Sequence, residues 1–277
     1  MHTSQNLKTV LLVQARPPRG EATRHEHRCI QRRVHGRQVR VVARSMFAQR
    51  PSPRWLDGVD AVVMGGSGSL GVHDAEAQAV LPALRRLIDA CLDRGIPGFG
   101  ICFGHQVLGF HLGAAVATDP RRAERGTVTC VRSRRASIDP VFRHLGPRFR
   151  AHAGHADHVA EVPAGVTLLA HNTTLKTQAF KVNGAPFYST QFHPDMNADE
   201  ARWRYRRCAS HLARSPQELE AQARAFDPAC RDTDSLMGQF LDWALPVARR
   251  GSQPRVARHR LRLPARPRPM PQQASNA

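Results

Sequence analysis

The stretch GFGICFGHQVLG, residues 98–109, places a cysteine between two glycines directly after a short apolar run. Gly100, Cys102 and Gly104 fall within five residues, and the following residues continue in a helical pattern. Small neighbours let a chain turn sharply from a strand into a helix, so that the side chain at the turn points into a cleft. The sulfur then lies near a helix N-terminus, which favours the thiolate. This stretch therefore predicts a nucleophilic Cys102 on a strand-to-helix turn.

Strand-like and helical patterns alternate on both sides of this turn. We expect strands at 10–13, 39–45 and 60–66, and helices at 22–33, 74–94 and 105–112. The helix at 74–94 has apolar residues at helical spacing, with Asp74 as a candidate cap and Gly95 at its end. This alternation predicts an α/β fold with a central, mostly parallel sheet flanked by helices.

The second half of the chain is richer in strands. Residues 126–133 and 166–172 are strand-like, and a hairpin is expected to turn at Asn183 and Gly184. A helical segment follows at 200–248, interrupted near Pro216 and Pro228. Residues 249–277 carry eight arginines and no acidic residue and lack periodicity, which predicts disorder. We expect one domain at 1–248, with its core at about 8–200 and a helical extension at 200–248, followed by a tail at 249–277.

The formal charge of +19 raises the question of a nucleic-acid partner. Only Lys8, Lys176 and Lys181 are lysines, so the charge is almost entirely arginine, and it is spread along the chain. Aromatic residues make up 6% of the sequence, too few to predict platforms for base stacking. A general arginine bias plus a solvated tail is the favoured interpretation, and polyanion binding through the tail stays open as an alternative.

The apolar segments and the cysteines predict the compartment. No run of about 18 apolar residues occurs, so we expect no membrane partner. The apolar core near the N-terminus is too short for a secretory signal, so we expect a cytoplasmic protein. The six cysteines are scattered without a C-x-x-C pair, and we expect them to be reduced.

Two further segments end predicted strands, as the cysteine turn does. They are GGSGSLG at 65–71 and YSTQFHPDM at 188–196. The carboxyl ends of parallel strands share one edge of a sheet, where reactive groups gather. His193 and Asp195 are two residues apart on what is predicted to be an extended strand, so their side chains are expected to share a face, with Pro194 fixing the backbone between them. The pattern predicts a base and its orienting acid beside Cys102.

These three motifs, about 36 and 91 residues apart, resemble those of the class I (triad) glutamine amidotransferases. The resemblance is strongest to the glutaminase domain of GMP synthase and its free-standing relatives, and it covers roughly residues 8–200. It implies a flavodoxin-like α/β fold. It also implies hydrolysis of the glutamine side-chain amide through a cysteine thioester, with release of ammonia.

The resemblance implies a role for each matching residue. Cys102 would be the nucleophile, His193 the base and then the acid, and Asp195 the residue that orients His193. The backbone N–H groups of Gly66 and Phe103 would form the oxyanion hole, and Gln106 would help to bind the substrate.

The sequence departs from the family pattern at two positions. The family usually has glutamate where Asp195 stands, so the acid here is one methylene shorter. The family often has proline after the Gly-Gly pair, whereas Ser67 and Gly68 follow it here. A more flexible loop could leave the oxyanion hole unformed until a ligand binds.

Other functions stay open from the sequence. No Ser-Gly-Gly-x-Asp-Ser loop for ATP is present, so the ammonia would go to a separate synthase, such as a GMP synthase-like partner. A γ-glutamyl hydrolase would use the same Cys–His–acid chemistry on a larger leaving group. A catalytically weak polyanion-binding protein is a further alternative.

Three histidines at 152, 155 and 158 have a spacing like that of metal ligands. Gly154 argues against a helix there, and no cysteine or acidic cluster accompanies them apart from Asp157. We therefore expect no metal and no cofactor, and we expect His155 to shape the rim of the active site. Glu124 and Arg125 are further candidates for positions near the cleft.

Overall fold

The computed structural model describes residues 7–208 and 215–246. The strands are β1 (Lys8–Gln14), β2 (Val39–Ser45), β3 (Ala61–Met64), β4 (Gly98–Ile101), β5 (Val116–Thr118), β6 (Glu124–Arg132), β7 (Arg148–His155), β8 (Asp157–Val159), β9 (Val166–His171), β10 (Ala179–Val182) and β11 (Phe187–Thr190). The α-helices are α1 (Glu21–Arg33), α2 (Ala75–Arg94), α3 (Phe103–His111), α4 (Ala198–Cys208), α5 (Pro216–Ala223) and α6 (Leu236–Ala244). The predicted tail at 249–277 lies outside the described residues.

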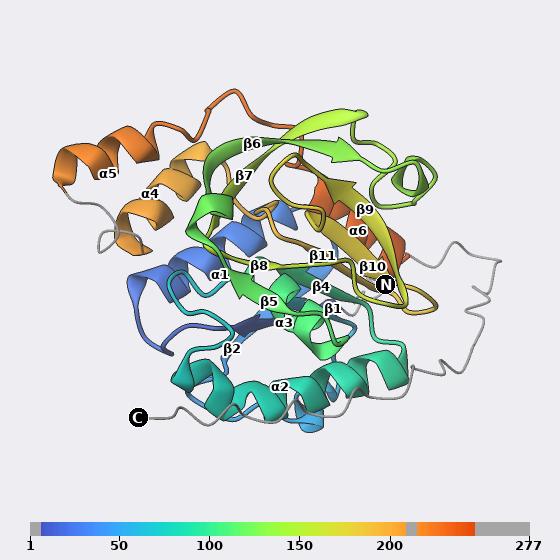
Figure 1. Ribbon diagram of the computed structural model, residues 1–277. Coiled ribbons are helices and arrows are strands. Elements are labelled where there is room, and N and C mark those ends of the chain that lie inside the picture. Colours follow the sequence, from blue (N-terminus) through green and yellow to red (C-terminus); the bar gives the residue numbers. More distant parts are fainter. Residues whose placement is uncertain (1–6, 209–214, 247–277) are drawn as a thin grey trace, which may run out of the picture.

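A nine-stranded sheet runs through the molecule in the order β2-β1-β3-β4-β11-β10-β9-β6-β7 (Figure 1). The five strands from β2 to β11 are parallel to one another. The four strands from β10 to β7 continue the sheet in antiparallel pairing, beginning with the predicted hairpin between β10 and β11. Strands β5 and β8 form a separate antiparallel pair. The prediction of an α/β fold with a strand-rich second half is confirmed.

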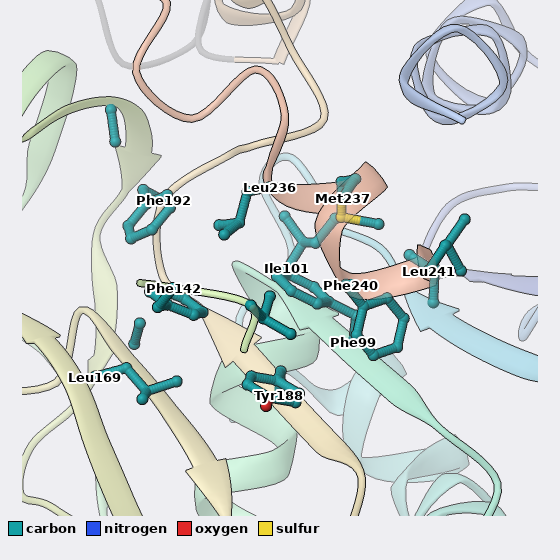
Figure 2. Packing of buried hydrophobic residues seen from close by; sticks show 14 of the residues in the cluster. Phe99, Ile101, Phe142, Leu169, Tyr188, Phe192, Leu236, Met237, Phe240 and Leu241 are labelled. Carbon is teal, nitrogen blue, oxygen red and sulfur yellow. The ribbon is translucent and has the colours of Figure 1, made fainter. Parts of the chain in front are cut away.

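Helices cover both faces of the parallel part of the sheet. Val10 and Leu12 of β1 point into a core with α1 and α6, whereas Leu11 and Val13 point into a core with α2 and α3. This alternation follows from the two-residue period of a strand, and burial of both faces explains why these strands are almost wholly apolar. Figure 2 shows the first core, where Phe240 of α6 packs edge-on against Phe99 of β4, with ring centroids 5.2 Å apart.

The helix boundaries agree with the predicted ones at Gly95 and near Pro216 and correct the role of Asp74. Gly95 ends α2 in the left-handed conformation at φ 63°, as glycine favours there. Asp74 occupies the N-cap position, but its carboxylate accepts a hydrogen bond from the Gly71 N–H at 2.7 Å and none from the helix. The helical segment is interrupted near Pro216 and Pro228, as predicted, and Pro216 begins α5 because proline suits the first helical position.

Strands β5, β7 and β8 were not predicted. β7 pairs along its whole length with β6, and together they extend the antiparallel half of the sheet. Helices α4 and α5 pack beside these strands (Figure 1). Within the described ranges, no helix has the length and apolar character needed to cross a membrane.

Candidate active site

Cys102 occupies the sharp turn between β4 and α3. Its φ of 52° and ψ of −101° make it the one non-glycine residue with positive φ among residues 7–208 and 215–246. A Cβ on Gly100 would lie 2.7 Å from the Gly104 carbonyl oxygen, and a Cβ on Gly104 would overlap the Met64 carbonyl oxygen. The two glycines therefore permit the close approach that the turn requires. A strained conformation of this kind persists only where the surroundings fix it, and it is concentrated at functional sites.

His193 and Asp195 lie in a turn beyond β11, which ends at Thr190. The prediction that they share one face of an extended strand is therefore wrong. The turn nevertheless brings the two side chains into direct contact, with His193 Nδ1 at 3.0 Å from Asp195 Oδ1. The His193 N–H donates to the His152 carbonyl oxygen at 2.8 Å, which fixes the turn against β7.

His193 also lies beside Cys102 and Gly66. A Cβ built on Gly66 would lie 3.1 Å from His193 Cε1 and 3.6 Å from Cys102 Cβ. Cys102 is among the groups that raise the pKa of His193, through a hydrogen bond as well as charge. The Gln191 amide donates to Cys102 Sγ at 3.6 Å. Three motifs that are far apart in sequence thus meet at one point, and Gln191 joins them.

The charges of this group are set by burial and by neighbouring side chains. Burial lowers the pKa of His193, but the hydrogen-bonded Asp195 carboxylate and Cys102 outweigh it and raise that pKa to about 9. Burial raises the pKa of Asp195, but the His193 and Arg204 charges outweigh it and hold that pKa well below its usual range. At neutral pH, His193 is therefore an imidazolium and Asp195 a carboxylate, so a positive charge lies beside Cys102.

Arg204 of α4 was not predicted from the sequence. It is 4% exposed, and its Nη1 donates to Asp195 Oδ2 at 2.9 Å. Its Nη2 lies 3.3 Å from His25 Nδ1 on α1. Burial lowers the pKa of Arg204, but Asp195 outweighs it and raises that pKa above its usual value. Its one sequence signal is an arginine in the first helix after the His-Pro-Asp motif, and arginine is common throughout this chain.

The two predicted oxyanion-hole residues, Gly66 and Phe103, both lie next to Cys102. Phe103 is the first residue of α3, so its N–H belongs to the helix-terminal amides that have no acceptor within the helix. Gly66 is buried at the start of the loop after β3. This loop is anchored, because the Gly65 N–H donates to Val13 O at 3.0 Å and Arg16 Nη1 donates to Ser67 O at 3.3 Å.

A cavity of about 300 Å³ opens onto this group. Cys102, His193 and Gln106 all line it. The Gln106 amide donates to the Asp157 carbonyl oxygen at 2.7 Å and to Gln191 Oε1 at 3.3 Å. Four apolar or aromatic side chains also line the cavity: Leu70, Met196, Tyr205 and Phe226.

Of the candidate residues in the strand-rich half, some line the cavity and others do not. His155 and Arg125 line it, and Glu124 is buried at 3.0 Å from His155 Nε2. The side chain of His152 instead lies 3.0 Å from Thr127 Oγ1. Within residues 7–208 and 215–246, no three His, Cys, Asp or Glu side chains are arranged to hold a metal ion.

Comparisons with known proteins point to one family. The family described as glutamine amidotransferase class-I matches residues 25–207. The chain is 36% identical over 104 residues to a glutamine-hydrolysing GMP synthase subunit of Ignicoccus hospitalis, covering 38% of this chain and 53% of that protein. It is 32% identical over 112 residues to the GMP synthase subunit of the same name in Methanocaldococcus jannaschii, covering 40% and 57%. The match thus spans about half the length of these curated relatives.

Solved structures share the fold. A glutamine amidotransferase from Thermotoga maritima superposes with a TM-score of 0.64 at 22% identity, covering 87% of this chain and 99% of that one. A putative GMP synthase subunit from Thermoplasma acidophilum gives 0.56 at 25% identity, covering 74% and 96%.

Proposed function

The chain belongs to the class I glutamine amidotransferase family, and from this premise we propose that it hydrolyses the side-chain amide of glutamine with Cys102 as nucleophile. One observation carries the proposal. Cys102 sits at a strained strand-to-helix turn beside an imidazolium, His193, that is held by a buried carboxylate, Asp195. This arrangement supplies a nucleophile, an acid and an orienting group within one cavity.

The first half of the reaction forms a thioester. The Cys102 thiolate attacks the amide carbon, and the N–H groups of Gly66 and Phe103 stabilise the oxyanion that forms. His193 then donates its proton to the departing nitrogen. Ammonia leaves, and the γ-glutamyl group remains bound to sulfur while His193 is neutral.

The second half hydrolyses the thioester. Neutral His193 takes a proton from water, and the resulting hydroxide attacks the same carbon. The intermediate collapses with release of glutamate, and the thiolate–imidazolium pair is restored. Asp195 keeps Nδ1 of His193 occupied throughout, so that Nε2 is the nitrogen that exchanges protons.

A γ-glutamyl amide with a larger leaving group is a second candidate substrate. The cavity-lining side chains Leu70, Met196, Tyr205 and Phe226 favour it, because they can contact a large apolar leaving group, whereas ammonia has no apolar part for them to bind. The same Cys102 and His193 would act on either substrate.

Release of ammonia and glutamate from glutamine, compared with turnover of γ-glutamyl alkylamides, tests both candidates. We expect Cys102→Ala to abolish turnover and to leave the circular dichroism spectrum unchanged. If Cys102→Ala retained activity on both substrate types, the proposed nucleophile would be wrong. If only γ-glutamyl alkylamides were cleaved, the second candidate would replace the first.

We also propose that the ammonia is passed to a separate synthase. The support is the name of the curated relatives, which are subunits of a glutamine-hydrolysing GMP synthase. Affinity purification of the native protein should recover an ATP-using synthase, and that partner should raise the glutaminase rate. A rate that no co-purifying protein changes would contradict this assignment.

A further inference from the structure

We infer that Arg204 is a positioning residue that supplies the charge needed to keep a thiolate at Cys102, a role that rests on the proposed function of this site. The Asp195 carboxylate is 1% exposed and engaged at both oxygens. Oδ1 meets His193 Nδ1 at 3.0 Å, and Oδ2 accepts from Arg204 Nη1 at 2.9 Å. With both oxygens held, the carboxylate cannot rotate about its soft terminal torsion, so it faces the imidazole in one orientation.

The charges of the buried group balance only when Arg204 is included. The Cys102 thiolate and the Asp195 carboxylate carry two negative charges, and the His193 imidazolium carries one positive charge. Arg204 supplies the second positive charge. A net charge buried away from water is costly, and a titratable group becomes neutral instead of remaining charged there. Without Arg204, the least costly adjustment is for Cys102 to retain its proton.

The surrounding titratable groups leave this balance intact. Burial and Arg204 lower the pKa of His25 to about 4, and burial lowers that of His152 to about 4, so both are neutral at pH 7. Burial raises the pKa of Cys29 well above its usual value. Glu26 and Glu200 are paired with Arg16 and Arg32. The charge of Arg28 on α1 also lowers the pKa of His25.

The position of Arg204 is itself fixed. Its second terminal nitrogen lies 3.3 Å from His25 Nδ1, which can accept a hydrogen bond because His25 is neutral. The His25 ring stacks on Trp203, with centroids 4.3 Å apart and planes 21° from parallel. Arg204 is therefore held between α1 and the Asp195 turn.

The test compares Arg204→Gln, which retains a hydrogen-bond donor without the charge, with Arg204→Lys, which retains the charge. The readout is the rate of Cys102 alkylation by iodoacetamide between pH 6 and 10, followed by mass spectrometry of the Cys102 peptide. This measurement needs no glutamine, so it stands even if glutamine is not the substrate. Arg206→Met is the matched control, because Arg206 lies on the same helix but pairs with Glu220 at the surface.

We expect Arg204→Gln to slow alkylation at pH 7 by roughly tenfold or more and to move the pH profile upward, since tenfold corresponds to one pH unit. For Arg204→Lys and Arg206→Met, the alkylation rate at pH 7 should stay within about threefold of that of the parent protein. In an Asp195→Asn background, Arg204→Gln should cause little further loss, because one buried charge of each sign has then been removed. A folded Arg204→Gln protein with the parent alkylation profile would overturn the inference, as would equal losses in Arg204→Gln and Arg204→Lys.

Discussion

At the scale of single residues, four side chains form one buried line of contacts. Cys102 lies beside His193, which contacts Asp195, which in turn contacts Arg204. All four residues are at most 7% exposed, so the protonation of each group depends strongly on its neighbours. Replacing one of these functional groups should therefore change the protonation of the other three.

Asp195→Asn should lower turnover by about 10- to 10⁴-fold, as loss of a triad acid can. The amide cannot stabilise the imidazolium and can present the wrong atom to Nδ1. Steady-state kinetics with glutamine measure the loss, and thermal unfolding checks that the protein remains folded. Near-normal turnover would reduce the site to a Cys102–His193 dyad.

Asp195→Glu introduces the acid that the family usually has. Asp195 already reaches His193 directly at 3.0 Å and is packed against Arg204. An extra methylene must then be accommodated in a filled site, so we expect no gain and a modest loss of turnover. Steady-state kinetics of the variant and of the parent protein measure the change in turnover. A clear gain would mean that the aspartate contact is too long for full activity.

The pKa of His193 predicts how the rate depends on pH. The group is protonated below about pH 9, because Asp195 and Cys102 together outweigh the effect of burial and raise its pKa. Since the protonated form donates to the departing ammonia, kcat/KM should hold through neutral pH and fall as pH rises through about 9. In Asp195→Asn this decline should move to lower pH. A decline at the same pH in both proteins would assign it to another group.

At the scale of elements, the loop after β3 is held by a buried ion pair. Arg16 donates to the Ser67 carbonyl oxygen, and its Nε lies 3.4 Å from Glu26 Oε1. A Cβ on Gly65 would lie 2.5 Å from the same Glu26 oxygen, so the loop rests directly on the pair. Helix α1 and the segment between β1 and α1 thereby fix the position of the Gly66 N–H.

Replacing this pair should affect kcat more than KM. The double variant Arg16→Met, Glu26→Gln leaves no lone buried charge, and we expect it to lower kcat by roughly tenfold, less than the 10²–10³ that loss of an oxyanion donor costs. An oxyanion exists only in the transition state and intermediates, so substrate binding should change little. Arg19→Met, at an exposed neighbouring position, is the control. An unchanged kcat with lower thermal stability would limit the pair to a structural role.

The elements near Cys102 could be predicted because their signals are local. Apolar periodicity and Gly95 define α2, and the two glycines around Cys102 define the turn. The His-Pro-Asp segment was assigned to a strand because alternation alone does not show where β11 ends. β7 was missed because its register is set by pairing with β6, which is a long-range property.

At the scale of the whole molecule, the order of the strands creates the site. β3, β4 and β11 are neighbours in the parallel sheet, so the segments that follow their carboxyl ends meet at one edge. The sequence predicted this meeting of Gly66, Cys102 and His193 from motif order. It could not predict Arg204, because the packing of α4 against α1 and the Asp195 turn depends on the complete fold.

The most direct test of the account is labelling by a glutamine analogue that alkylates the active-site nucleophile. Burial raises the pKa of Cys29, Cys91, Cys130 and Cys230, so their thiols should react slowly. Cys208 is partly exposed in the same cavity and is the internal control. We predict one label per chain, on Cys102, with glutamine protecting against it and activity lost in proportion. Labelling of Cys208 instead, or full labelling of Cys102 without loss of glutamine hydrolysis, would contradict the account.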